Sequence, residues 1–406
     1  MIILSHPTGN QNVRNALIAL RESNLLDSFW TTLNWSEALW VNNLLPSAFR
    51  TQLKRRVFPD NIKCITGIYG LREIVRLIAR GLNFQALIKH NKTPFCVDAI
   101  YQSLDRHVAK DLYFQKNVSA VYAYEDGAMH TFPKARRLGI KCIYELPSSY
   151  WRVVKRTLKE EAELEPEWAS TLISNYDSRE KLLRKDEELR LADLIIVPSN
   201  MVKDTLSEAS GLKAPIKVIS YGAPPVFHKP PTLNKKLRVL FVGVLNQYKG
   251  LSYLFKACSG LGSLVDLTLI GNKPIKRCKA LETALKNHRW IKSLPHHMVL
   301  NEMQNHDVLV LPSLSEGFSL VILEAMSQGL PVIITEKTGG ADIVTDRVDG
   351  FIIPIRSSEA ISEKLEILAK NTDIRIQMGD AAREKAKLHT WEHYRNRFIE
   401  TIKNIL

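Results

Sequence analysis

Two carboxylates eight residues apart, Glu316 and Glu324, are the side chains in this chain of 406 residues whose spacing points most directly to chemistry. Gly317 follows the first carboxylate, and a glycine lets a ligand approach the backbone closely. The next backbone amides belong to Phe318, Ser319 and Leu320. Unpaired amides at the start of a helix bind phosphate oxygens. We therefore expect an anion-binding loop with one carboxylate before it and a second about two helical turns further on.

A strand, a helix and a second strand must position these residues. Residues 308–311 are apolar and predict a buried strand, which Pro312 ends. Gly329 and Pro331 end the helix before residues 332–335 form the next strand. Consecutive strands joined through a helix lie parallel in one sheet, so this stretch predicts a parallel α/β fold.

The residues around the two carboxylates form a recognisable pattern. A Gly-Phe pair follows Glu316 and an Ala-Met pair follows Glu324, which resembles the signature of glycosyltransferase family 4. Members of that family are retaining, nucleotide-sugar-dependent enzymes of the GT-B architecture. The resemblance implies that Glu316 lies beside the donor sugar, that Glu324 holds the ribose hydroxyls, and that the amides of residues 317–320 bind the diphosphate. It is specific over residues 192–400 and holds only in outline before them.

A second loop of the same half follows a predicted strand at 237–242 and contains Gly243 and Lys249. Amides and a lysine in such a loop can hold a diphosphate. Family members have an arginine directly after the first glycine, where this chain has Val244. Lys273, in the turn after the next strand, is the candidate to replace that charge, because both strand ends face the same cleft. The alternative is an exposed turn lysine.

The first half offers weaker signals. Residues 2–5 predict a strand, and the loop after it contains His6 and Gly9. The resemblance implies that Gly9 contacts the donor, and His6 is a weaker candidate. Where family members carry histidines on the acceptor side, the ends of later strands carry Glu125, Asp126 and Glu145, with His130 nearby. The acceptor chemistry therefore stays open.

These features predict an α/β protein of the GT-B architecture, in which two Rossmann-like domains face each other across a cleft. We expect an acceptor-side domain at residues 1–222, a proline-rich linker at 223–236 and a nucleotide-sugar domain at 237–387. A C-terminal helix at 388–406 is expected to cross back to the first domain.

The composition, with 45% hydrophobic and 24% charged residues, is that of a globular protein. No stretch reaches about 18 consecutive apolar residues, and the five cysteines are scattered, so we expect a cytoplasmic protein, either free or peripheral at the membrane. The adjacent His296 and His297 have no further ligand at a metal spacing. We expect no cofactor and no metal, because helix amides and Lys249 can stabilise a departing diphosphate.

The net charge is +14, and residues 1–110 hold fourteen Lys or Arg against seven Asp or Glu. Within this region, Arg72, Arg76 and Arg80 form a stripe beside an apolar helical face. An anionic membrane surface is therefore a candidate partner. The alternative is that the arginines are merely solvated and that the tryptophans earlier in this region, Trp30, Trp35 and Trp40, are core or substrate-groove residues. No nucleic-acid-binding module accompanies the charge, so nucleic acid is not an expected partner.

The resemblance implies a glycosyltransferase that moves a hexose-type sugar, with retention, from a nucleoside-diphosphate sugar to a hydroxyl of a glycan or lipid-linked acceptor, in polysaccharide or glycolipid synthesis. One alternative is a sugar-nucleotide epimerase of the same fold. Another is a non-catalytic nucleotide-sugar-binding or scaffold protein, which Val244 and the missing histidines favour. The nucleotide, the sugar and the acceptor stay open.

Overall fold

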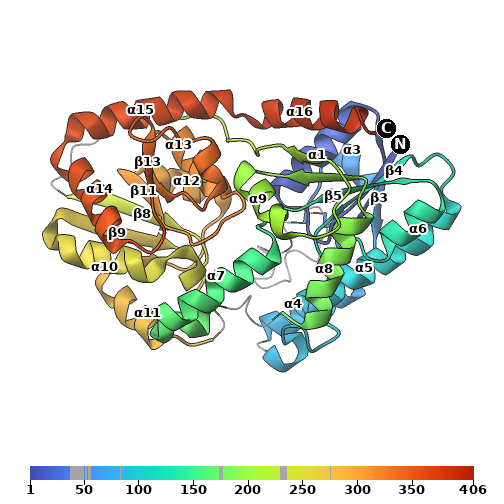
Figure 1. Cartoon of the computed structure of the whole chain (residues 1–406), viewed down its shortest axis with the longest axis horizontal. Coiled ribbons are helices and arrows are strands. Elements are labelled where there is room, and N and C mark those ends of the chain that lie inside the picture. Colours follow the sequence, from blue (N-terminus) through green and yellow to red (C-terminus); the bar gives the residue numbers. More distant parts are fainter. Residues whose placement is uncertain are drawn as a thin grey trace.

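The computed structural model describes residues 1–36, 50, 53, 56–82, 84–172, 177–228, 236–274 and 276–406. Its strands form two parallel sheets, one in each half of the molecule (Figure 1). The first sheet contains β1 (Ile2–Ser5), β2 (Leu26–Thr31), β3 (Thr66–Ile68), β4 (Ala120–Tyr124), β5 (Lys141–Glu145), β6 (Leu194–Val197) and β7 (Ile216–Val218). The second contains β8 (Leu237–Val242), β9 (Val265–Ile270), β10 (Arg289–Ile291), β11 (Val308–Leu311), β12 (Val332–Thr335) and β13 (Gly350–Ile353). The predicted α/β fold with two Rossmann-like halves is confirmed.

Helices cover both sheets. In the first half they are α1 (Gln11–Glu22), α3 (Asp60–Lys63), α4 (Leu71–Gly81), α5 (Val97–Asp111), α6 (Thr131–Arg137), α8 (Arg179–Leu191) and α9 (Asn200–Thr205). In the second half they are α10 (Leu251–Leu261), α11 (Lys279–Ala284), α12 (His296–Gln304), α13 (Leu320–Ser327), α14 (Ser358–Lys370) and α15 (Thr372–Leu388). The two halves are joined by α7 (Trp151–Leu164) and by α16 (Trp391–Lys403).

The strand order reverses at one place in each sheet. The first sheet runs β3-β2-β1-β4-β5-β6-β7 and the second runs β10-β9-β8-β11-β12-β13. Crossovers leave in opposite directions on either side of the β1–β4 pair and of the β8–β11 pair. Parallel α/β sheets bind ligands at the carboxyl ends of the strands beside such a reversal. The most deeply buried strands include β11 and β12, as expected for strands covered on both faces.

The C-terminal helix returns to the first half, as predicted. Figure 1 shows α15 and α16 in line along one edge of the molecule, with α16 reaching the first sheet's side. Arg395 of α16 donates to the Asn15 side chain of α1 at 3.0 Å, and the ring of Phe398 packs against that of Tyr122. Residues 229–235 of the expected linker lie outside the described part of the chain.

Helix α7 precedes that linker in sequence, yet its far end packs on the second half. Glu161 is fully buried there and accepts hydrogen bonds from Gln247 Nε2 at 2.7 Å, Tyr253 OH at 3.0 Å and Arg356 Nε at 2.9 Å. Beyond α7, Trp168 stacks on Phe255 of α10. The segment from Trp151 to Thr171 is therefore a second link between the halves. The buried Glu161 carboxylate fixes this segment to the second half through its three hydrogen bonds.

Candidate nucleotide-sugar site

The residues expected to bind the donor follow neighbouring strands of the second sheet. Gly243 and Lys249 follow β8, Lys273 follows β9, and Glu316 follows β11. Because β8 lies between β9 and β11, these strand ends meet beside the point where the strand order reverses. The structure thus brings side chains that are far apart in sequence to one edge of the sheet.

Lys249 and Glu316 form an ion pair between the loops after β8 and β11. Both side chains are largely buried, and the Leu314 amide donates to the Tyr248 carbonyl at 2.9 Å, which fixes one loop against the other. Glu316 itself is held by its backbone, since its amide donates to the Lys337 carbonyl at 2.9 Å. The Glu316 carboxylate and the Lys249 ammonium therefore lie together at the carboxyl ends of the strands. A sugar diphosphate bound there would offer hydroxyls to the carboxylate and negative charge to the ammonium.

The amides before helix α13 are available to an anion. Ser319 is the residue that precedes the helix, and its side chain makes no capping hydrogen bond. Within the described ranges, no hydrogen-bond partner is found for the amides of Phe318, Ser319 and Leu320. These are the donors that the sequence predicted to bind a diphosphate, and the helix dipole adds to their attraction for an anion. The Phe318 side chain points away from this role, since it packs on the Tyr221 ring of the first half.

Glu324 lies one turn into α13 and faces His296, one of the two adjacent histidines for which the sequence showed no metal-ligand spacing. His296 Nε2 lies 2.8 Å from Glu324 Oε1, and this hydrogen bond raises the pKa of His296 above its usual value. A ribose that binds Glu324 must share the carboxylate with His296 or displace it. Because His296 and Glu324 are 28 residues apart, no local sequence signal could have found this pairing.

Gly317 packs closely against the first half of the molecule. Its carbonyl accepts from Ser199 Oγ at 2.8 Å, and a Cβ at this position would lie 2.1 Å from the Pro147 carbonyl oxygen. The neighbouring Ser315 hydroxyl lies 2.8 Å from that of Ser149. Position 317 therefore requires a glycine because the backbone of the first half packs directly against it. This is a second reason for the glycine, besides the close approach of a ligand that the sequence suggested.

Lys273 lies beside the same loops, with its ammonium 4.1 Å from the centre of the Trp290 ring. The turn that carries it is fixed, because the Leu245 amide donates to the Asn272 carbonyl at 3.0 Å. A Cβ at Gly271 would lie 1.7 Å from the Gly243 carbonyl oxygen, so these two glycines let the turns after β8 and β9 touch. Val244 is exposed between them. Whether Lys273 reaches a diphosphate stays a prediction.

The first loop of the chain is held by its own contacts. His6 Nδ1 accepts from the amides of Thr8 at 3.1 Å and Gly9 at 2.9 Å, and burial lowers the pKa of His6 to about 3. Gly9 is buried with φ +62°, and a Cβ there would lie 2.5 Å from the Phe58 ring. The glycine is thus required by the turn itself. Its contact with a donor stays a prediction.

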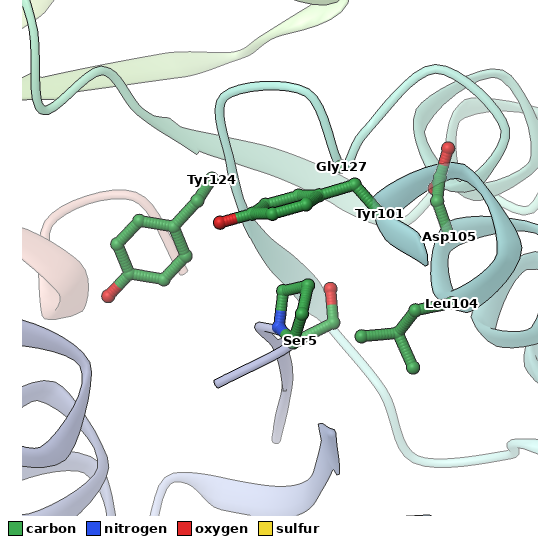
Figure 2. Close-up of a pocket in the computed structure, with 7 residues that line it drawn as sticks. Ser5, Tyr101, Leu104, Asp105, Tyr124 and Gly127 are labelled. Carbon is green, nitrogen blue, oxygen red and sulfur yellow. The ribbon is translucent and has the colours of Figure 1, made fainter. Parts of the chain in front are cut away.

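A small cavity lies under this loop, at the ends of β1 and β4 (Figure 2). The rings of Tyr101 and Tyr124 border it, and both also pack on His6. Asp105, another lining residue, accepts the amides of His130 and Thr131 and so caps α6. The cavity volume of 10 Å³ leaves room for about one water, so this is not a substrate site.

The prediction that Glu145 stands on the acceptor side is wrong. It is 1% exposed and accepts hydrogen bonds from Asn12 Nδ2 at 3.0 Å, Tyr221 OH at 2.7 Å and Tyr122 OH at 2.5 Å. Burial raises the pKa of this carboxyl above its usual value. The last residue of a strand can point into the core as readily as into the cleft, and sequence position alone does not distinguish the two.

A larger cavity of 220 Å³ lies between the halves. Ser149, Trp151, Lys155 and Lys185 line it from the first half, and Tyr248 lines it from the second. It adjoins the donor loops, because Tyr248 directly precedes Lys249. Glu125, which the sequence placed on the acceptor side, pairs at 3.0 Å with Lys185, one of the residues that line this cavity.

In the part of the chain that the structure describes, no cluster of three His, Cys, Asp or Glu side chains is arranged to hold a metal ion. All five cysteines are free thiols. None of the helices in the described ranges is long and apolar enough to cross a membrane.

Comparison with known proteins agrees with this geometry. Residues 223–385 match the family model of Glycosyl transferases group 1. The D-inositol 3-phosphate glycosyltransferase of Corynebacterium urealyticum is 27% identical over 265 residues, which cover 57% of this chain and 62% of that protein. The chain spans less than two thirds of the length of the curated relatives that it matches first.

Solved structures show the same fold over the whole chain. The sucrose-phosphate synthase of Thermosynechococcus elongatus superposes with a TM-score of 0.70 at 17% identity, covering 100% of this chain and 98% of that one. HepE of Anabaena, solved in complex with UDP and glucose, superposes with a TM-score of 0.65 at 15% identity, covering 99% of each chain. The expected GT-B architecture is therefore confirmed.

Proposed function

We propose that this protein transfers a hexose-type sugar, with retention of configuration, from a nucleoside-diphosphate sugar to a hydroxyl of a glycan or lipid-linked acceptor. The observation that carries the proposal is the set of amides at Phe318, Ser319 and Leu320, which have no hydrogen-bond partner among the described residues and lie beside the Lys249–Glu316 pair. Amides and an ammonium stabilise the charge that develops on a departing diphosphate. Glu324, further along the same helix, would hold the ribose.

The relatives support a nucleotide-sugar donor. The matched family model is one of glycosyl transferases, and the HepE structure of similar fold contains UDP and glucose. The cavity between the halves supports transfer over epimerisation, since an acceptor needs a place next to the donor and an epimerase does not. A non-catalytic role is less well supported, because Glu316, Glu324 and Lys249 are all present at the site.

The test is turnover with nucleotide sugars in the presence and absence of acceptors. Release of nucleoside diphosphate that depends on an acceptor, together with an NMR spectrum of a product that keeps the donor's anomeric configuration, is the expected result. Conversion of the nucleotide sugar to its epimer without any acceptor would overturn the proposal. So would inversion at the anomeric carbon.

Replacing Gly317 by alanine is expected to lower turnover at least about 10-fold, because the new Cβ would clash with the Pro147 carbonyl and move the loop from the first half. Nucleotide affinity should change less, since the amides of residues 318–320 stay on the second half. The control is Gly260→Ala, where a Cβ meets nothing within 4 Å. Steady-state kinetics and calorimetry of both variants separate the effects. Equal turnover of the two variants would contradict this role of Gly317.

Lys273 is proposed to supply the charge that Val244 lacks. Lys273→Ala is then expected to weaken binding of the nucleoside diphosphate about 10-fold while leaving the nucleoside unaffected, because a hydrogen bond to a charged group contributes about 1.5 kcal/mol or more. Adding Val244→Arg should partly restore the affinity. Calorimetry with both ligands is the measurement. An equal loss for both ligands, or no loss, would mean that Lys249 and the helix amides suffice.

A further inference from the structure

Helix α4 carries its apolar side chains on the outside of the protein. Leu71 is 77% exposed, and Ile74 and Ile78 are also exposed on the same face, at helical spacing. The chain beyond the helix continues the pattern with Leu82, Phe84 and Leu87. We name these six residues the α4 surface. Contiguous exposed apolar side chains on a soluble domain mark a place where another surface binds.

Helix α4 buries a carboxylate beside two apolar side chains, Leu77 and Ala79. Glu73 is 1% exposed, and it pairs with Arg56 and with Arg76, whose Nε lies 2.7 Å from Glu73 Oε2. The helix thus buries a neutralised acidic residue with two apolar ones, while Leu71, Ile74 and Ile78 face out. A helix that only covered a core would not leave three large apolar side chains exposed on one face. Among the other cations of residues 1–110, Arg56 is buried, and Lys54 and Arg55 lie outside the described residues.

The segment that carries the α4 surface is rich in cations. Residues 61–97 contain six Lys or Arg, and Glu73 is their only acidic residue. Arg80, Lys89 and Lys92 are exposed. Exposed apolar side chains with a cationic rim match a bilayer that carries anionic headgroups, because the apolar part enters the acyl boundary and the cations contact the headgroups.

The α4 surface is connected to the cavity between the halves. Shortly after Leu87, His90 Nε2 lies 2.8 Å from Asp177 Oδ1, and Asn91 also donates to this carboxylate. Asp177 lines the cavity of 220 Å³. Figure 1 shows α4 on the edge of the molecule opposite α16. A membrane at this edge would meet the protein beside the cavity.

We propose that the α4 surface docks this protein on anionic membranes. Docking is a property of the first half and goes beyond the transfer reaction, so it can be tested without turnover. It also assigns the lipid-linked class to the acceptor, and this second step rests on the proposed function.

The test is sedimentation of the full chain with vesicles of phosphatidylcholine alone or mixed with phosphatidylglycerol, over a range of salt. Binding to the anionic vesicles is expected, with a steep fall as salt rises. The double variant Arg80→Gln with Lys89→Gln should weaken vesicle binding about 30-fold, because it removes two cations that contact the headgroups. Lys213→Gln with Lys217→Gln removes the same charge from another exposed part and should have a much smaller effect.

The apolar contribution needs its own variant. Ile74→Ser with Ile78→Ser is expected to weaken vesicle binding at every salt concentration, whereas Leu388→Ser, at an exposed apolar position far from α4, is not. Circular dichroism and the melting temperature establish whether each variant is folded. If the serine variant does not fold, the charge variants still test the proposal independently. Absence of binding to anionic vesicles at low salt would overturn the proposal, as would equal losses in the control variants. A dimer that only the serine variant disrupts, without vesicle binding, would identify a second copy as the occupant instead.

Discussion

Replacing Glu316 by glutamine is expected to lower turnover about 100-fold to 1,000-fold, the range found when one group that stabilises transition-state charge is removed. The structure places this carboxylate at the front of the site, paired with Lys249. Affinity for the nucleoside diphosphate should stay the same or rise, because the glutamine releases Lys249 from its partner. Single-turnover kinetics and calorimetry measure the two quantities separately.

Glu324→Ala is the matched comparison for this variant. It removes the carboxylate that faces His296 and that we expect to bind the ribose, so it should weaken the nucleotide about 10-fold or more and change the chemical step less. Since Glu324 lies within α13, circular dichroism must establish that the variant is folded. If both variants lost affinity equally and kept their rate, the assigned roles would be wrong.

The largest expected effect on stability comes from Glu161→Ala. The substitution leaves the Arg356 guanidinium, Gln247 and Tyr253 without their buried acceptor, and breaking a buried charge pair in this way costs about 3–5 kcal/mol. Arg356 has φ +63°, a conformation that residues other than glycine rarely adopt, and its bond to Glu161 helps to hold it there. Because α7 links the halves, the lower free energy of unfolding should appear in the main unfolding transition.

Urea unfolding of Glu161→Ala and of Glu163→Ala provides the measurement and its control. Glu163 lies on the same helix and is exposed, so its replacement should change the free energy of unfolding by less than about 0.5 kcal/mol. Comparable values for the two variants would show that α7 does not depend on the buried carboxylate.

The sequence predicted the centre of the second half well. Strands at 308–311 and 332–335 were expected and are present as β11 and β12, because apolar runs bounded by Pro312, Gly329 and Pro331 leave little choice. The helix between them starts at Leu320. These signals are local, so they can be read without knowing what packs against them. The amides before α13, which have no partner in the part of the chain that the structure describes, follow from the same local pattern.

Contacts between distant segments could not be predicted in this way. The close packing of Gly317 against Pro147, the pairing of His296 with Glu324 and the burial of Glu161 all join residues from different elements. Glu145 was misplaced for the same reason, since only the packed tyrosines around it decide which way its side chain points. The outward apolar face of α4 was also ambiguous, because its spacing fits a buried helix equally well.

The central claim is that the site around Glu316 and α13 binds a nucleoside diphosphate, and thermal unfolding in the presence of the common nucleoside diphosphates tests it most directly. Binding to the folded state alone raises the melting temperature with ligand concentration. We predict that at least one of these ligands stabilises the wild-type protein, that the effect is reduced in Glu324→Ala, and that it persists in Glu316→Gln. A melting temperature that none of them changes at millimolar concentration, or a shift that is the same in Glu324→Ala, would contradict the account.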